Sequence, residues 1–134
     1  MAYIKHEKYP NGMIAGSTGF YGVHISDAET LKLLYTFEDS NDQYYQQCYV
    51  RTLNLLVVGS QSGVVQTIDL SDMKKVEAKD DSIANKFIAL DAGTRSFEVS
   101  TYPEETYFAA GTEKGTIHVF ETRHLKQKKT YKYA

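Results

Sequence analysis

One pattern constrains the fold of this chain more than any other: a short apolar run that ends in glycine, with an apolar residue nine positions beyond it. The pattern occurs three times, at Gly16 with Ile25, Gly59 with Ile68, and Gly111 with Phe120. After each run, turn residues lead into a second extended segment. A motif that recurs at such spacing predicts a repeat architecture, in which each copy is one unit of supersecondary structure.

Strand-forming residues dominate the rest of the sequence. Eleven Tyr and six Phe lie in short runs with Val, Ile and Thr, and Gly, Asn, Asp and Ser clusters separate the runs. Such alternation of strand and turn residues is typical of an all-β, antiparallel protein. We therefore predict one domain over 1–134 with three four-stranded meanders, at about 1–42, 43–78 and 94–134, and an insertion at about 79–93.

Some segments carry finer predictions. In the first meander, residues 10–12 are expected to form the first turn, because they combine Pro, Asn and Gly. In the second meander, residues 73–78 are expected to form the last strand. Within the insertion, Asp81 or Ser82 can cap a short helix, and an extra strand at 86–90 is the alternative.

Two segments, 55–69 and 107–121, resemble the second and third strands of WD40-repeat blades. The spacing of 43 residues between Ile25 and Ile68 also fits that family. A Trp-Asp pair commonly ends the third strand of such blades, and Asp69 is the one literal match to it in a chain without Trp. The resemblance implies three blades of a partial β-propeller.

Propellers close with four to eight blades, so three blades leave two end faces uncovered. The resemblance therefore implies completion by other chains or by self-association, since exposed apolar sheet faces drive contact with protein. The function that it implies is a non-enzymatic protein–protein interaction scaffold within a larger assembly. The alternative is a small closed antiparallel β-barrel that binds an apolar small molecule.

Motifs for catalysis, cofactors or metals are not evident. Residues 59–63 carry Gln at the centre, where a nucleophile elbow has Ser, and are expected to form a hairpin turn. Cys48 has no second Cys, and no metal-ligand spacing relates the four histidines. These are His6, His24, His118 and His124. We expect no enzyme, no cofactor and no metal site.

Candidate partner contacts come from tyrosines and lysines. Tyr44 and Tyr45 are adjacent and must point to opposite faces of a strand, so one of them is expected to be an exposed contact. Near the end of the chain, Lys126, Lys128 and Lys132 alternate along a predicted last strand, while the net charge of the chain is −2. These lysines suit the protection of a sheet edge, and nucleic acid is a less favoured partner for them.

The address of the chain is expected to be intracellular, either cytoplasmic or nuclear. The first residues are charged where a secretory signal needs an apolar core, and a single cysteine excludes an internal disulfide. No apolar run approaches the roughly 20 residues of a membrane-spanning helix, so no membrane partner is expected.

Overall fold

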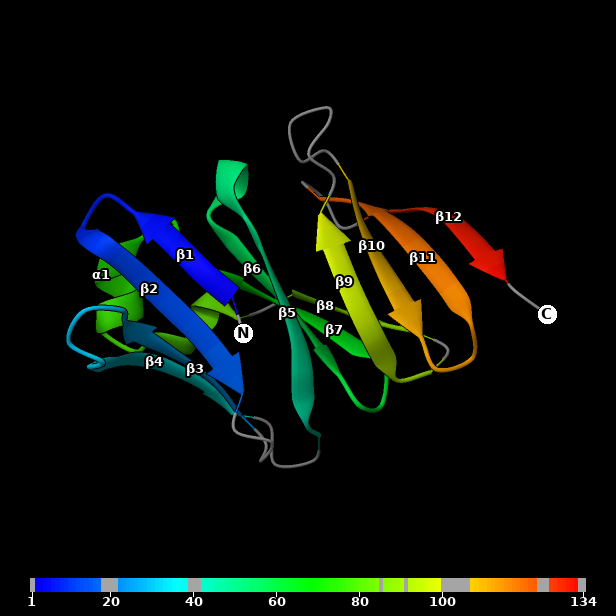
Figure 1. The fold of residues 1–134 in the computed structure, drawn as a ribbon, viewed down its shortest axis with the longest axis horizontal. Coiled ribbons are helices and arrows are strands. Elements are labelled where there is room, and N and C mark those ends of the chain that lie inside the picture. The colour runs from blue at the N-terminus through cyan, green and yellow to red at the C-terminus, as the bar shows by residue number, and fades with distance from the viewer. Residues whose placement is uncertain are drawn as a thin grey trace.

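The computed structural model describes residues 2–17, 22–38, 42–84, 86–90, 92–99, 107–122 and 126–132. It consists mainly of antiparallel strands arranged in three sheets of four strands each (Figure 1). In each sheet the strands follow one another in chain order. The prediction of an all-β, antiparallel fold is confirmed.

The first sheet contains β1 (Ala2–His6), β2 (Tyr9–Ser17), β3 (Gly22–Asp27) and β4 (Leu33–Glu38). The predicted turn at 10–12 is wrong, because the chain already reverses between His6 and Tyr9, which pair with each other. Gly12 instead lies within β2 at a φ of +81°, under the Tyr3 ring. A Cβ on Gly12 would meet that ring at 2.5 Å, so the glycine serves a close approach within the strand rather than a turn.

The middle sheet contains β5 (Tyr44–Val50), β6 (Leu55–Ser60), β7 (Val64–Asp69) and β8 (Lys86–Ala89). A 3₁₀ turn, η1 (Arg51–Leu53), joins β5 to β6. The segment between β7 and β8 forms a helix, α1 (Met73–Glu77), and a second 3₁₀ turn, η2 (Asp81–Ile83).

The prediction that 73–78 forms a strand is therefore wrong, and the alternative strand in the insertion is β8, the fourth strand of the middle sheet. The physical reason is local. The Asp72 carboxylate accepts a hydrogen bond of 3.0 Å from the backbone N–H of Lys74 and so caps α1. Met73 and Val76 lie three positions apart and are both buried, which is a helical spacing. Within the described residues, no helix has the length and hydropathy needed to cross a membrane.

The last sheet contains β9 (Thr94–Val99), β10 (Tyr107–Thr112), β11 (Thr116–Glu121) and β12 (Lys126–Lys132). Along β10 and β11, buried and half-exposed residues alternate strictly. The turn glycines behave as predicted, since Gly63 and Gly115 have φ values of +100° and +76°. Residues 103–105, which are Pro-Glu-Glu, are expected from sequence to form a turn, and they lie outside the described residues.

The three sheets stand side by side as a fan, joined through their first strands (Figure 1). β5 lies against β1 and β2 of the first sheet, and β9 lies in the same way against β5 and β6 of the middle sheet. Among the described strands, no pairing connects one sheet to another. The strands therefore do not close into the single barrel that was the alternative prediction.

The middle sheet is shared by two hydrophobic cores. Leu56 and Val58 of β6 enter the core between the first and middle sheets, while Val57 enters the core between the middle and last sheets. Successive residues of a strand point to opposite faces, so one strand supplies both cores. Both faces of the middle sheet are thereby covered.

Equivalent residues of the glycine-marked repeat do not point in the same direction in all three sheets. The residue before each repeat glycine is Ala15, Val58 or Ala110. Ala15 faces the sheet that follows its own, whereas Val58 and Ala110 face the sheet that precedes theirs. At equivalent positions of the repeat, side chains of the first sheet therefore point in the opposite direction along the fan from those of the other two sheets. Ile14, which precedes Ala15, points outward as a result.

Candidate interaction surfaces

Tyr44 was one of two candidates for an exposed contact, and the structure contradicts that role. Its side chain is 2% exposed and belongs to the core between the first and middle sheets. Its ring meets Phe37 edge-on, with ring centroids 5.2 Å apart and an interplanar angle of 83°. The side chain of Tyr45 lies outside the described part of the structure.

The three predicted contact lysines, Lys126, Lys128 and Lys132, all lie in β12. This strand is the outermost of the last sheet and pairs only with β11 among the described strands. The sequence expectation of a lysine-rich edge strand therefore holds for the backbone. Because the lysine side chains are outside the described part, their role as contacts stays a prediction.

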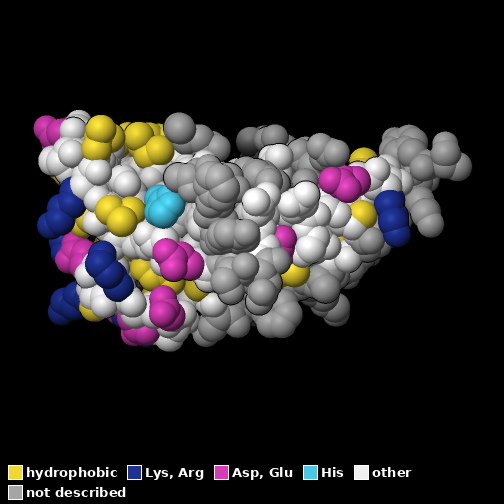
Figure 2. Space-filling model, turned by 90° about the horizontal axis from the view of Figure 1, so that it is seen from below, with side chains coloured by type: hydrophobic (Ala, Val, Ile, Leu, Met, Phe, Trp, Pro, Cys, Tyr) yellow, Lys and Arg dark blue, Asp and Glu magenta, His cyan; other side chains and the backbone are white. Residues whose placement is uncertain are grey.

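The first sheet presents an uncovered face, here called the first outer face. It is centred on one row of cross-strand neighbours, in which Tyr3 pairs with Ile14, Ile14 with Ser26, and Ser26 with Leu33. Tyr3 is 57% exposed and Leu33 46%, and the other two residues are half-buried. Viewed from below, hydrophobic side chains reach the surface at this end of the molecule, among charged ones (Figure 2).

The next row of the first outer face contains a glycine, a histidine and a threonine. Gly16 pairs with His24, and His24 pairs with Thr36. The Nδ1 atom of His24 lies 3.2 Å from the Thr36 hydroxyl, within hydrogen-bond distance. This contact gives His24 a partner within its own sheet. The row is flat at Gly16, where a Cβ would meet nothing within 4 Å.

The face of the last sheet that points away from the middle sheet is here called the last outer face. It is formed by the half-exposed residues of the alternating strands β10 and β11. Ala109 pairs with Val119, Gly111 with Ile117, and Tyr107, 37% exposed, with Glu121. The opposite face of the same strands carries Phe108, Ala110 and Phe120, which are buried against the middle sheet. Both outer faces therefore carry apolar side chains, and on the last outer face the register also pairs Ala109 with Glu98 and Val119 with Lys129.

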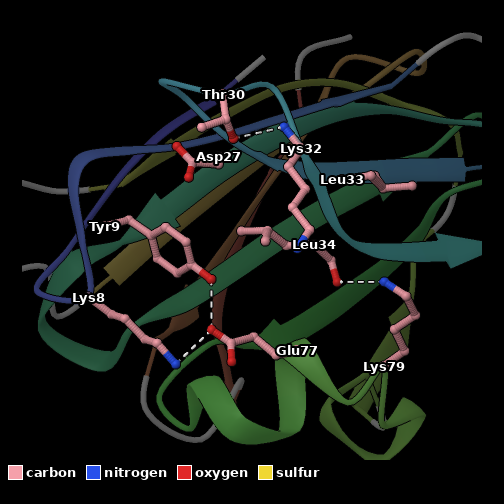
Figure 3. Close-up of a pocket in the computed structure, with 9 residues that line it drawn as sticks. All are labelled: Lys8, Tyr9, Asp27, Thr30, Lys32, Leu33, Leu34, Glu77 and Lys79. Atoms are coloured by element: carbon pink, nitrogen blue, oxygen red, sulfur yellow. Dashed lines mark hydrogen bonds and ion pairs between the residues drawn. The ribbon is translucent and has the colours of Figure 1, made fainter.

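A pocket of about 650 Å³ lies between the first sheet and α1 (Figure 3). Its lining is strongly charged, with three lysines and two acids among nine residues. The lining residues are Lys8, Tyr9, Asp27, Thr30, Lys32, Leu33, Leu34, Glu77 and Lys79. Because Lys8 and Glu77 are 69 positions apart, sequence reasoning had no signal that brings them together.

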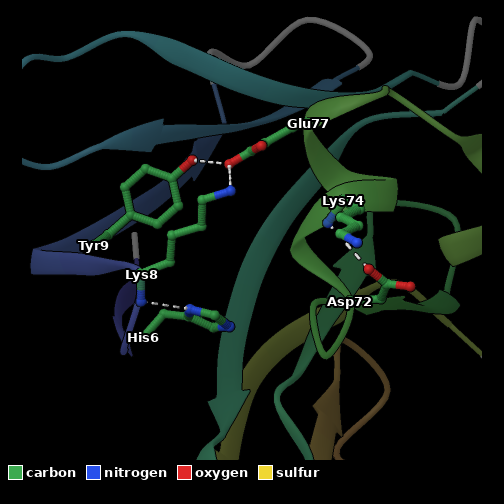
Figure 4. A network of polar contacts seen from close by, with 6 residues as sticks. All are labelled: His6, Lys8, Tyr9, Asp72, Lys74 and Glu77. Atoms are coloured by element: carbon green, nitrogen blue, oxygen red, sulfur yellow. Dashed lines mark hydrogen bonds and ion pairs between the residues drawn. The ribbon is translucent and has the colours of Figure 1, made fainter.

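Glu77 is the centre of the polar contacts in this pocket (Figure 4). Its Oε1 atom accepts a hydrogen bond of 2.7 Å from the Tyr9 hydroxyl and lies 2.7 Å from the Lys8 ammonium. Burial, followed by the hydrogen bond to Glu77 and its charge, raises the pKa of Tyr9 to about 12. The same Lys8 and Tyr9 hydrogen bonds lower the pKa of Glu77.

The other end of the pocket is also held by internal contacts. The Lys79 ammonium donates a hydrogen bond of 3.1 Å to the backbone carbonyl of Leu34. Nearby, the Tyr35 hydroxyl donates to Asp81 over 3.2 Å, and burial, with this bond next in size, raises the pKa of Tyr35 to about 12. Two of the three lysines of the pocket therefore have partners within the protein. The arrangement attaches α1 and η2 to the first sheet and is not organised as a receptor for an anion.

The serines of residues 59–63 are likewise engaged in a turn. The Ser60 hydroxyl accepts a hydrogen bond of 2.8 Å from the backbone N–H of Val64, and the Ser62 hydroxyl donates to the Asp42 carboxylate. Although burial alone would raise the pKa of Asp42, hydrogen bonds from Ser62, Ser60 and the backbone outweigh it and lower the pKa. This geometry confirms a hairpin turn at these residues.

Comparisons with known proteins add no family. The chain matches no model of a known protein family, and it has no significant match among curated proteins. In the described part of the chain, no three His, Cys, Asp or Glu side chains are grouped closely enough to hold a metal ion. The two outer faces are therefore the features from which a function is argued.

Proposed function

We propose that this chain is a non-enzymatic protein–protein interaction module. In this proposal its three sheets are blades of an incomplete WD40-like β-propeller that acts as a scaffold within a larger, intracellular assembly. Function is argued from the surfaces, because a fold alone supports many functions.

The observation that carries the proposal is the contrast between the middle sheet and the two end sheets. The middle sheet is covered on both faces by apolar packing. Each end sheet has apolar side chains on its outer face, where Tyr3, Leu33 and Tyr107 are exposed. A contiguous apolar face of several hundred Å² is typical of a site that another protein covers.

The radial arrangement supports the propeller part of the proposal. The first strands β1, β5 and β9 adjoin one another, and each belongs to a different sheet. In a propeller, the innermost strands of neighbouring blades adjoin around the axis in this way. The lysine-rich β12 suits an acidic protein surface better than a nucleic acid, since the net charge of the whole chain is −2.

The test is the native size of the protein in cell extracts from its source, measured by size-exclusion chromatography of a tagged chain. We expect the protein to elute in a complex well above its own 15.2 kDa. A chain with both Ile14→Arg and Val119→Arg should leave that complex, because a charge is placed on each outer face. Gln61→Arg, at an exposed turn of the middle sheet, is the matched control and should remain in the complex. Elution of the unsubstituted chain as a monomer would overturn the proposal.

A further inference from the structure

The contact between neighbouring sheets is repeated within the chain. β5 lies against the first two strands of the first sheet, and β9 lies against the first two strands of the middle sheet. If a fourth sheet followed the last one with the same packing, its first strand would lie against β9 and β10. In a second copy of this chain, the strand available for that position is β1, whose sheet has an uncovered outer face.

The two outer faces have matching chemistry. The first outer face presents Tyr3, Ile14 and Leu33 beside the flat row that contains Gly16. The last outer face presents Ala109, Ile117 and Val119. The contact already formed between the middle and last sheets has the same character, because Val57 and Val65 pack there against Phe108 and Phe120.

The charges of the outermost strands are complementary. β12 contains four lysines and no acid. β4 contains one acid, Glu38, and no basic residue. In a face-to-face contact that repeats the internal one, first strands adjoin first strands, so β12 of one copy lies beside β4 of the other. Opposite charge at that rim favours this orientation and opposes its reverse.

The size of the faces decides between an open and a closed arrangement. Four strands about 4.8 Å apart, with about six residues at about 3.3 Å each, make a face of roughly 400 Å². One contact would bury roughly 800 Å² in total, which is the size of a crystal contact, whereas two contacts would bury roughly 1,600 Å², the standard size of a stable interface.

We propose that two copies of this chain dock head to tail, with the last outer face of each copy on the first outer face of the other, and close a ring of six sheets. Six lies within the four to eight blades of known propellers. This inference rests on the proposed function and adds to it the identity of the partner. The contact is heterologous, because two different faces meet in it.

The test is sedimentation equilibrium of the purified full chain and of two single variants. The unsubstituted chain should have the mass of a dimer. Ile14→Arg blocks the first outer face and Val119→Arg blocks the last, so each variant alone should be monomeric, since both contacts of its dimer contain a blocked face. Circular dichroism of each variant checks that it is folded, and Gln61→Arg should stay dimeric.

The alternative outcomes separate the two proposals. If the purified chain is monomeric at all concentrations but occurs in a native complex with a different polypeptide, the dimer is overturned and the proposed function stands. If it is monomeric in both settings, both fail. If only one of the two variants abolishes dimers, the head-to-tail contact is overturned in favour of one that joins two identical faces. A mass above that of a dimer would overturn closure of the ring at two copies.

Discussion

At the scale of single residues, two tyrosine hydroxyls join the segment after β7 to the first sheet. Tyr9 donates to Glu77 of α1, and Tyr35 donates to Asp81 of η2. Both phenols are placed beside carboxylates, so a second negative charge would be unfavourable at either position. The attachment therefore depends on the phenols staying protonated.

Alkaline pH is predicted to weaken this attachment. The pKa of Tyr9 and of Tyr35 is raised from 10.0 to about 12, mainly by burial and then by the neighbouring carboxylates. A raised pKa means that the neutral phenol stabilises the fold fully below pH 10.0 and that this contribution is lost as the pH rises toward about 12. We expect the urea midpoint of the unsubstituted chain to fall in that window and to fall less in the double variant Tyr9→Phe, Tyr35→Phe. Equal losses in both chains would contradict the prediction.

Two glycines are predicted to respond in opposite ways to the same substitution. Gly63 has a φ of +100°, and a Cβ there would lie 2.5 Å from the Ala92 carbonyl oxygen. Gly63→Ala should lower the free energy of unfolding by roughly 2 kcal/mol or more. Gly16 has open space around it, so Gly16→Ala should be neutral or stabilise by about 0.5–1 kcal/mol through the unfolded state. Urea denaturation of both variants at low protein concentration provides the measurement, and equal effects would show that the glycine environments are misassigned.

At the scale of elements, α1 fills the space between the first and middle sheets with very few residues. Val76 is fully buried in that core, whereas its neighbour Lys75 is exposed. Val76→Ala should lower the free energy of unfolding by about 2 kcal/mol, through lost burial and the cavity left behind. Lys75→Ala, one position away, should change it by less than about 0.5 kcal/mol. If thermal and urea denaturation gave the two variants the same stability, α1 would not pack as described.

The elements that sequence predicts well are those with a strong local signal. β10 and β11 combine strict alternation with a turn glycine, Gly115, and together they occupy the segment 107–121 that was predicted from sequence to contain two strands. α1 was mistaken for a strand because five residues are too few for periodicity to decide, and its clearest signal was the capping residue Asp72. β8 was left as an alternative for the same reason.

The surfaces were less predictable than the strands, because they depend on how sheets face one another. Strand alternation predicts that Tyr44 and Tyr45 point in opposite directions, but it does not say which direction is inward, and the register of β5 shifts between Tyr44 and Gln46. The first sheet shows the same limit, since Ala15 and Val58 hold equivalent places in the repeat but face opposite ways along the fan. The contact of Lys8 with Glu77 depends on packing between distant segments and has no local signal.

At the scale of the whole molecule, the middle sheet couples the two cores. Leu56 and Val58 lie in one core and Val57, between them, lies in the other, so neither core can be lost without disturbing β6. A chain of this size with a shared sheet is expected to unfold in a single cooperative transition. A substitution that destabilises the last sheet should therefore also lower the stability of the first sheet.

This coupling predicts the effect of a substitution in the last sheet on hydrogen exchange in the first. Phe120 is fully buried against the middle sheet, and Phe120→Leu should cost about 1–2 kcal/mol, the transfer and cavity cost of losing part of a buried ring. The most protected amides of β2 and β3 exchange through global unfolding, so their exchange should accelerate by roughly five- to thirty-fold. The experiment uses Ile14→Arg as the background, so that loss of self-association does not contribute. Acceleration confined to β10 and β11 would mean that the last sheet opens by itself and that the two cores are independent.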